Sequence, residues 1–184
     1  MAFAHHVHVR NAGIQIFAAD HFKAQSLVEG GGMHLGAEHL AAQVLRLLDY
    51  VIFNALIGNH DAHAKNLSLL YSGKAPVLAP FYDTLSTAVY PALTPKMAMK
   101  IGSKYKFGEV QARHWEQFAE GAGLAKAQAR QRILELAKSL PSIARKLQSD
   151  PDHGYVGNAV VERINALIEQ RCALTIRQIA EPSA

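Results

Sequence analysis

The first long apolar pattern of the chain lies between residues 36 and 57. Apolar side chains recur there at steps of three and four residues, which is the spacing of one face of a helix. The members of this stripe are Leu40, Val44, Leu48, Val51, Ile52 and Ala55. Gly58 follows directly, and glycine readily adopts the left-handed backbone angles that end many helices. The pattern predicts one long helix that ends near Gly58.

After this helix the pattern changes to short strand-like runs. Residues 67–71 and 76–78 form two such runs, and the sequence SGKA between them contains the glycine typical of a hairpin loop. A second possible hairpin starts at residues 97–101, just before the sequence GSKYKFGEV. The sequence therefore predicts one or two small β-hairpins inserted after the long helix.

The rest of the chain has a helical pattern. The predicted helices cover residues 110–122, 126–140 and 156–179. Pro141 bends or ends the middle helix, although its continuation still has a helical pattern. We predict a mainly α (α+β) fold, in which an irregular N-terminal segment with a glycine-rich linker, residues 1–35, precedes a helical domain, residues 36–184.

Composition narrows the class of protein. The chain has 184 residues, 49% of them hydrophobic and 18% charged, which is an ordinary globular balance. The net charge is +4 without a dense Lys/Arg run, so this mild basic bias suits a phosphate site without deciding the partner. A single cysteine, Cys172, fits a reducing cytoplasm. We see no apolar run of membrane-spanning length and expect no membrane association.

The sequence NHDAHAKN, residues 59–66, has the densest group of side chains that could bind a metal or take part in catalysis. A metal-binding interpretation uses His60 and His63, which are three residues apart around Asp61. That spacing differs from the two histidines four apart on a helix in zinc proteases. A His–Asp doublet also occurs in helical metal phosphohydrolases, but here a predicted hairpin follows at once. A third interpretation is a polar turn whose Asp and Asn side chains only cap helices.

The spacing of acidic and amide side chains favours phosphoryl transfer. In protein kinases a catalytic-loop Asp precedes an Asn by five residues, and a second Asp follows a short hairpin. Asp61 and Asn66 have this spacing, and Asp83 follows the predicted hairpin. Hard oxygen ligands of this kind suit Mg²⁺ bound to nucleotide phosphates. Lys65 lies within the loop, where it would steady the phosphoryl group.

Several motifs occur in an order that resembles one family. The motifs are IGNHDAHAKNLSLLY, LAPFYDTLST, KMAMKIGSKYKF and RHWEQFAEGAGL. Together they resemble the C-terminal part of HipA-like serine/threonine kinases, the toxins of bacterial toxin–antitoxin pairs. The resemblance implies a protein-kinase-like C-terminal lobe in which Asp61 is the catalytic base and Asn66 and Asp83 hold Mg²⁺. It also implies that His63 braces the loop and that Lys65 neutralises phosphate charge.

The same resemblance implies ATP as a substrate, a protein phosphorylated on serine or threonine, and an antitoxin partner through which DNA is reached only indirectly. The N-terminal lobe of a kinase, with its phosphate-covering loop and its strand lysine, has no counterpart in this sequence. The segment EGGGMHLG lacks flanking strands and is interpreted as a linker. We therefore expect little or no kinase activity from this chain alone. A non-catalytic module that binds an antitoxin or a separate N-lobe is the alternative.

Overall fold

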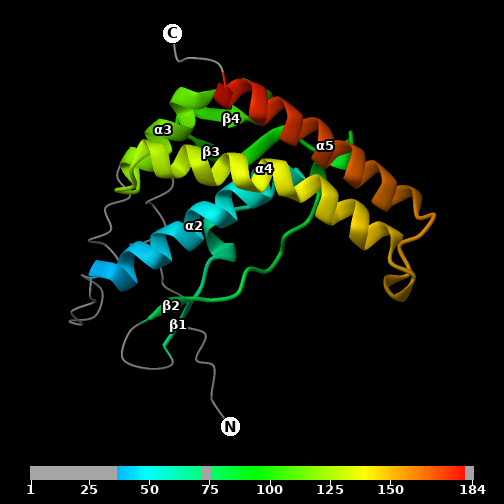
Figure 1. Cartoon of the computed structure of the whole chain (residues 1–184), viewed down its shortest axis with the longest axis horizontal. Helices are drawn as coiled ribbons and strands as arrows, with labels where there is room; N and C mark the ends of the chain where they lie inside the picture. The colour runs from blue at the N-terminus through cyan, green and yellow to red at the C-terminus, as the bar shows by residue number, and fades with distance from the viewer. Residues whose placement is uncertain (1–36, 72–75, 181–184) are drawn as a thin grey trace.

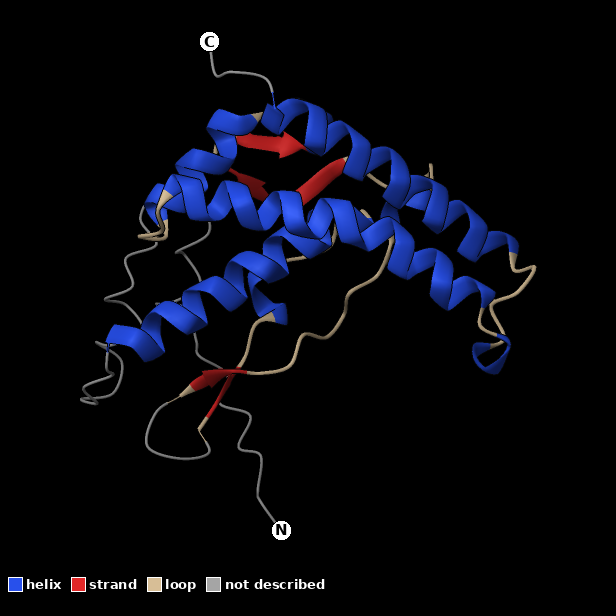
Figure 2. Cartoon of the chain, viewed as in Figure 1, coloured by secondary structure: helices blue, strands red, loops and turns tan. Residues whose placement is uncertain are grey.

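The computed structural model describes residues 37–71 and 76–180, and the predicted irregular N-terminal segment with its glycine-rich linker, residues 1–35, lies outside this range. The first described element is helix α2 (Ala37–Ile57), which matches the helix predicted from the apolar stripe. Helices α3 (Ala112–Gly121), α4 (Lys126–Ser149) and α5 (Ala159–Ala180) follow after two small antiparallel sheets. The mainly helical α+β fold is thus confirmed (Figures 1 and 2).

Both predicted hairpins are present, and the first is shorter than expected. Strand β1 (Leu69–Leu70) pairs with β2 (Val77–Leu78), and β3 (Lys96–Ile101) pairs with β4 (Lys104–Lys106). The first hairpin is attached to α2 because the Leu78 amide donates to Gln43 Oε1 at 2.8 Å. The ring of His39 reaches the carbonyl oxygen of Pro76 at 2.8 Å. These two contacts hold the second strand of the hairpin against α2.

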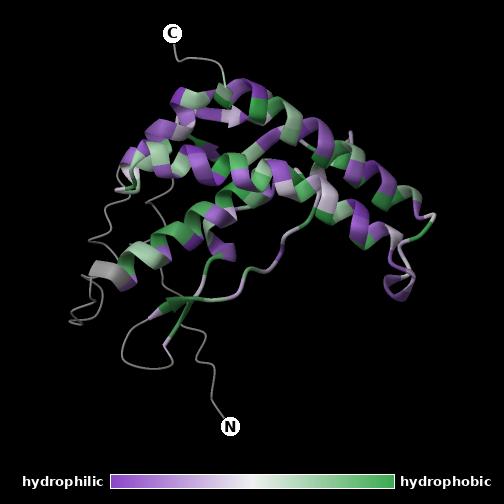
Figure 3. Cartoon of the chain, in the orientation of Figure 1, coloured by the Kyte–Doolittle hydropathy of each residue, from purple (hydrophilic) through white to green (hydrophobic). Residues whose placement is uncertain are grey.

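The core lies where α2, α4 and α5 pack together, with α3 and β3 closing one end (Figure 1). Leu48 and Ile52 of α2 are fully or almost fully buried, as the apolar stripe predicts, and so is Leu56. Trp115 and Cys172 are buried in the same core, and Phe118 and Leu124 pack against it. The colouring of Figure 3 shows α2 as a largely apolar helix.

The expectation that no stretch has the length and hydropathy of a membrane span needs correction for α2. The window from His39 to Ile57 passes a length and hydropathy test for a membrane-spanning helix, with a mean hydropathy of 1.6. In the fold, 61% of this window is buried within the molecule, as is usual for the core helix of a globular domain. The stretch is therefore weak evidence for a membrane span.

Two helix boundaries differ from the sequence prediction for local reasons. Helix α4 continues through Pro141 to Ser149, so the proline does not end it. Helix α5 begins at Ala159 and not near residue 156, because Gly157 has a left-handed φ of 71°. Asn158 Oδ1 then accepts from the amides of Val160 and Val161, which caps the new helix.

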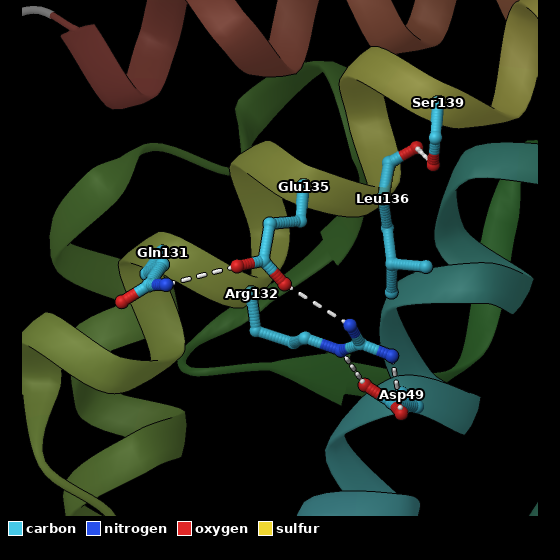
Figure 4. Close-up of polar contacts among 6 residues, drawn as sticks. All are labelled: Asp49, Gln131, Arg132, Glu135, Leu136 and Ser139. Carbon is cyan, nitrogen blue, oxygen red and sulfur yellow. Dashed lines mark hydrogen bonds and ion pairs between the residues drawn. The ribbon is translucent and has the colours of Figure 1, made fainter.

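A bidentate ion pair joins α4 to α2. The Nε and Nη2 of Arg132 donate to the two carboxylate oxygens of Asp49 at 2.6 and 2.9 Å (Figure 4). Glu135, one turn further on α4, accepts from Arg132 Nη1 at 3.0 Å. The planar guanidinium matches a carboxylate in this geometry. The pair is half-exposed, so it fixes the register of the two helices more than it stabilises them.

Candidate active site

The NHDAHAKN segment begins where α2 ends. Gly58 has a φ of 77°, and the Asn59 amide donates to the carbonyl oxygen of Asn54 at 2.9 Å, the pattern of a Schellman cap. A Cβ at Gly58 would lie 2.6 Å from Leu167 Cδ2 and 2.9 Å from Ala88 Cβ. Glycine is therefore required at this position both for its backbone angle and for the close approach of two neighbouring segments.

Asn59 connects the parts of the site. Its buried amide nitrogen donates to Asn54 Oδ1 and to the carbonyl oxygen of Asp83, both at 2.8 Å. Its Oδ1 accepts from the backbone amide of Asp61 at 3.0 Å. One side chain thus joins the end of α2, the start of the loop and the segment after the first hairpin. No sequence signal indicated this role for Asn59, the first residue of the NHDAHAKN segment.

Asn66 and Asp83 meet on the far side of the hairpin. Asn66 closes the short helix η2 (Ala64–Asn66) and is 6% exposed. Its Nδ2 donates to Asp83 Oδ2 at 2.7 Å. The bond fixes which way the amide points and leaves one oxygen on each residue, Asn66 Oδ1 and Asp83 Oδ1, outside it. Asp83 itself has a φ of 56°, a left-handed angle that is uncommon outside glycine and is often kept at functional positions.

The other predicted site residues lie on the same loop. Asp61 and Lys65 are exposed to solvent. The carbonyl oxygen of Lys65 accepts from the Tyr82 hydroxyl at 3.0 Å, a second contact between the loop and the segment that carries Asp83. His63 is half-buried, and its carbonyl oxygen accepts from the Asn66 amide at 3.0 Å. Its Nδ1 is buried without a hydrogen-bond partner among the described residues.

Tyr50 of α2 lies beneath the Asn66–Asp83 pair. The side chain is fully buried, and its ring centroid is 4.9 Å from that of Phe81, two residues before Asp83. Its hydroxyl makes no hydrogen bond of ordinary geometry to a described residue, although the Asn66 side chain is near enough to lower the pKa slightly. Burial, with the nearby charge of Asp83, raises the pKa of Tyr50 to about 12, so the hydroxyl stays protonated. No sequence signal distinguished Tyr50 from the other buried residues of α2.

His60 is engaged on both ring nitrogens. Its Nδ1 lies 3.0 Å from the carbonyl oxygen of Thr94, and its Nε2 lies 2.7 Å from Nη2 of Arg171. A carbonyl only accepts and a guanidinium only donates, so the ring is neutral with its proton on Nδ1. Burial and the charge of Arg171 lower the pKa of His60, in agreement with this assignment. These contacts contradict the interpretation of His60 as a metal ligand.

A metal cluster of the phosphohydrolase kind finds no further support. Across residues 37–71 and 76–180, no three His, Cys, Asp or Glu side chains gather as metal ligands do. The described geometry instead brings together Asn66 and Asp83, with Asp61 tied to them through Asn59.

Sequence comparison identifies the family. A family model described as the HipA-like C-terminal domain matches residues 8–144. The chain belongs to this family. A putative kinase, Y4mE, of Sinorhizobium fredii is 40% identical over 134 residues, which are 73% of this chain and 32% of that protein. The serine/threonine-protein kinase toxin HipA of Shewanella oneidensis is 28% identical over 95 residues, 52% of this chain and 22% of that toxin.

A solved structure has the same fold. The complex of HipA, HipB and operator DNA from Shewanella oneidensis contains a chain that superposes with a TM-score of 0.66 at 24% sequence identity. The match covers 76% of the present HipA-like chain and 33% of the solved one. The present chain therefore spans a third or less of these relatives, and their names describe longer proteins.

Proposed function

We propose that this HipA-like chain is the C-terminal lobe of an ATP-dependent serine/threonine protein kinase. The observation that carries the proposal is the 2.7 Å hydrogen bond from Asn66 to Asp83 across the first hairpin. It joins the amide and carboxylate that the kinase pattern requires, in a chain whose relatives are named kinases.

The proposed metal ligands are Asn66 and Asp83. Each keeps one oxygen outside their mutual hydrogen bond, and an amide oxygen with a carboxylate oxygen is a donor set that suits Mg²⁺. The bound ion would neutralise charge on the nucleotide phosphates. Because the Asn66 side chain is held by Asp83 and Asp83 is held through its carbonyl by Asn59, the two oxygens are positioned before any ligand arrives.

Asp61 is the proposed catalytic base. Its side chain is exposed, so the hydroxyl of a protein substrate has access to it, and Asn59 fixes its backbone. Lys65 is exposed on the same loop and is proposed to neutralise charge on the transferred phosphoryl group. His63, whose side chain is half-buried in the same loop, is proposed to brace the loop.

The surroundings of the site favour a lobe that needs a partner. Large apolar side chains next to Asp83 are exposed: Phe81, Tyr82, Leu85, Tyr90 and Leu93. Exposed apolar patches often mark contact sites in soluble proteins, and we propose that these side chains contribute to one. We propose that an N-terminal kinase lobe covers it and that the chain alone has little or no turnover. Alignment between two lobes is worth up to about 7–11 kcal/mol of barrier.

The proposal extends to the cell biology of the family. The solved relative is a complex with HipB and operator DNA, so we propose an antitoxin partner, with DNA reached only through that partner. ATP and a protein substrate in the bacterial cytoplasm complete the proposal. The exposed apolar surface equally suits a second function, a non-catalytic module that binds an antitoxin or another lobe without using ATP.

Mg²⁺-dependent nucleotide binding separates these functions. Calorimetric titration of ATP into the 184-residue chain is expected to show weak binding with Mg²⁺ and none with EDTA. Asp83→Ala is expected to abolish binding, and the matched control Asp152→Ala, an exposed carboxylate on the α4–α5 connection, is expected to preserve it. ATP binding that is unchanged by EDTA and by Asp83→Ala would refute the kinase proposal. Absent ATP binding with tight binding of an antitoxin-type protein would establish the non-catalytic module.

A further inference from the structure

Arg171 of α5 is a buried cation without a carboxylate partner. It is 9% exposed, and among the described residues no acidic side chain lies within ion-pair distance of it. Burying an isolated charge is unfavourable unless other groups compensate. The α5 helix that carries it begins at Ala159, beyond the end of the family match at residue 144. The family comparison therefore assigns no role to this residue.

Three groups compensate the charge of Arg171. Its Nη1 donates to the carbonyl oxygen of Ala55 at 2.8 Å, in the last turn of α2. The C-terminal end of a helix carries partial negative charge and carbonyl oxygens without intrahelical partners. The guanidinium carbon lies 4.3 Å from the centroid of the Phe107 ring, within cation–π range. The third group is His60 Nε2, at 2.7 Å.

The contact with His60 connects α5 to the proposed catalytic loop. The backbone of His60 is held on both sides, since its amide donates to Thr87 Oγ1 at 2.8 Å and its carbonyl oxygen accepts from the Ala98 amide at 2.7 Å. The next residue along the chain is Asp61. The guanidinium of Arg171, from a residue 111 positions later in the sequence, thus adds a side-chain contact to a residue whose backbone already has two partners.

We propose that Arg171 is a positioning residue of the active site, which holds the Asn59–Asn66 loop through His60 and the end of α2 through Ala55. It touches neither substrate nor metal in this account. Burial lowers the pKa of Arg171 to about 10, which leaves it charged at neutral pH and able to serve both acceptors at once. Lysine at this position would reach one acceptor, because its single ammonium lacks the planar fork of a guanidinium.

The expected effect on nucleotide affinity rests on the proposed function, whereas the expected effect on amide exchange does not. The variants are Arg171→Met, Arg171→Lys and the matched control Arg177→Met, an exposed arginine on the same helix. The first readout is hydrogen–deuterium exchange of the amides of Asn59, Asp61 and Ala98. The second is the affinity for Mn²⁺·ATP.

In Arg171→Met we expect exchange of these three amides to accelerate about ten-fold or more, and Mn²⁺·ATP affinity to fall about ten-fold, because hydrogen bonds to a charged group are lost. Arg171→Lys should show a smaller loss in both, and Arg177→Met none. Unchanged exchange and affinity in folded Arg171→Met would overturn the proposal. If the wild-type chain binds no Mn²⁺·ATP, the kinase proposal fails while the exchange rates still decide the role of Arg171.

A measurement on the unmodified chain covers the case in which Arg171→Met does not fold. ¹⁵N NMR of the imidazole rings reports which nitrogen carries the proton. We expect His60 to be the neutral tautomer with hydrogen on Nδ1 and with Nε2 as a hydrogen-bond acceptor. Hydrogen on Nε2 would be incompatible with donation from Arg171 and would overturn the proposal.

Discussion

The side chains of Asn66 and Asp83, 17 residues apart, are joined by a 2.7 Å hydrogen bond from Nδ2 to Oδ2. The hairpin between them brings the chain back onto the loop that follows α2, and Asn59 secures the return through the carbonyl oxygen of Asp83. The chemistry proposed for the site depends on this relationship, because it places two oxygen donors from distant sequence positions side by side.

Asn66→Asp is expected to make stability depend on Mg²⁺. The substitution removes the amide donor and places a second carboxylate against Asp83, and like charges at this distance repel each other. Without metal the melting temperature should fall, and added Mg²⁺ should restore it by binding between the two carboxylates. The measurement is thermal denaturation with and without Mg²⁺.

The control for this experiment is Asn158→Asp. Asn158 caps α5 through its Oδ1, a role that aspartate performs equally well, so no Mg²⁺ response is expected. If both variants respond to Mg²⁺ to the same extent, the response is not specific to the Asn66–Asp83 pair.

Gly58→Ala should be strongly destabilising. An alanine in the left-handed region costs roughly 1–2 kcal/mol, and its Cβ would collide with Leu167 and Ala88, which adds about 1–3 kcal/mol of overpacking. Gly123→Ala is the matched control, since Gly123 has a φ of 72° but no atom within 4 Å of the added Cβ. Chemical denaturation should show the larger loss for Gly58→Ala; equal losses would argue against the close approach at the end of α2.

Tyr50→Phe should not destabilise the fold. The Tyr50 hydroxyl is buried and makes no hydrogen bond of ordinary geometry to a described residue, with the Asn66 side chain as the one described polar neighbour that affects its pKa by hydrogen bonding. An unsatisfied polar group of this kind costs about 1–3 kcal/mol. Tyr50→Phe removes this hydroxyl and keeps the ring contact with Phe81. We expect the free energy of unfolding to rise by about 1 kcal/mol, with exposed Tyr105→Phe unchanged. A clear loss of stability would show that the hydroxyl has a partner in solution.

Stability should fall as the solution is acidified through the ordinary titration range of histidine. Burial, and then the charge of Arg171, lowers the pKa of His60, and burial with Arg113 and Lys104 lowers that of His114. Unfolded histidine takes up a proton below about pH 6.5 while these folded rings stay neutral, so protons favour the unfolded chain. Their contribution is complete above that pH and is lost below it. Melting temperatures should decline less steeply in His60→Gln; an unchanged slope would contradict this.

The sequence predicted the parts of the site that depend on local pattern. The stripe from Leu40 to Ala55 and the glycine at 58 defined α2 and its end, because helix periodicity and left-handed caps are properties of neighbouring residues. The spacing of Asp61, Asn66 and Asp83 around a hairpin could also be recognised in the sequence. A tight hairpin returns the chain to nearly the same place, so residues on its two sides come close together. The metal and base roles of these residues remain predictions.

The long-range contacts that support the site and the helix packing could not be predicted from the sequence. Arg171 reaches His60, and Arg132 reaches Asp49, across 111 and 83 residues, and neither pair shares a periodicity with its neighbours. The position of Arg132 on its helix does not by itself reveal that α2 lies opposite. Long-range pairs of this kind follow from the packing of α2, α4 and α5, which no local rule specifies.

Paramagnetic NMR tests the central claim most directly. With Mn²⁺ in place of Mg²⁺ and ATP present, the account predicts that the ¹⁵N side-chain amide signal of Asn66 and the backbone signal of Asp83 broaden first, at low metal concentration. Broadening centred on His60 or His63, or no selective broadening anywhere, would contradict the assignment of Asn66 and Asp83 as the metal-binding pair.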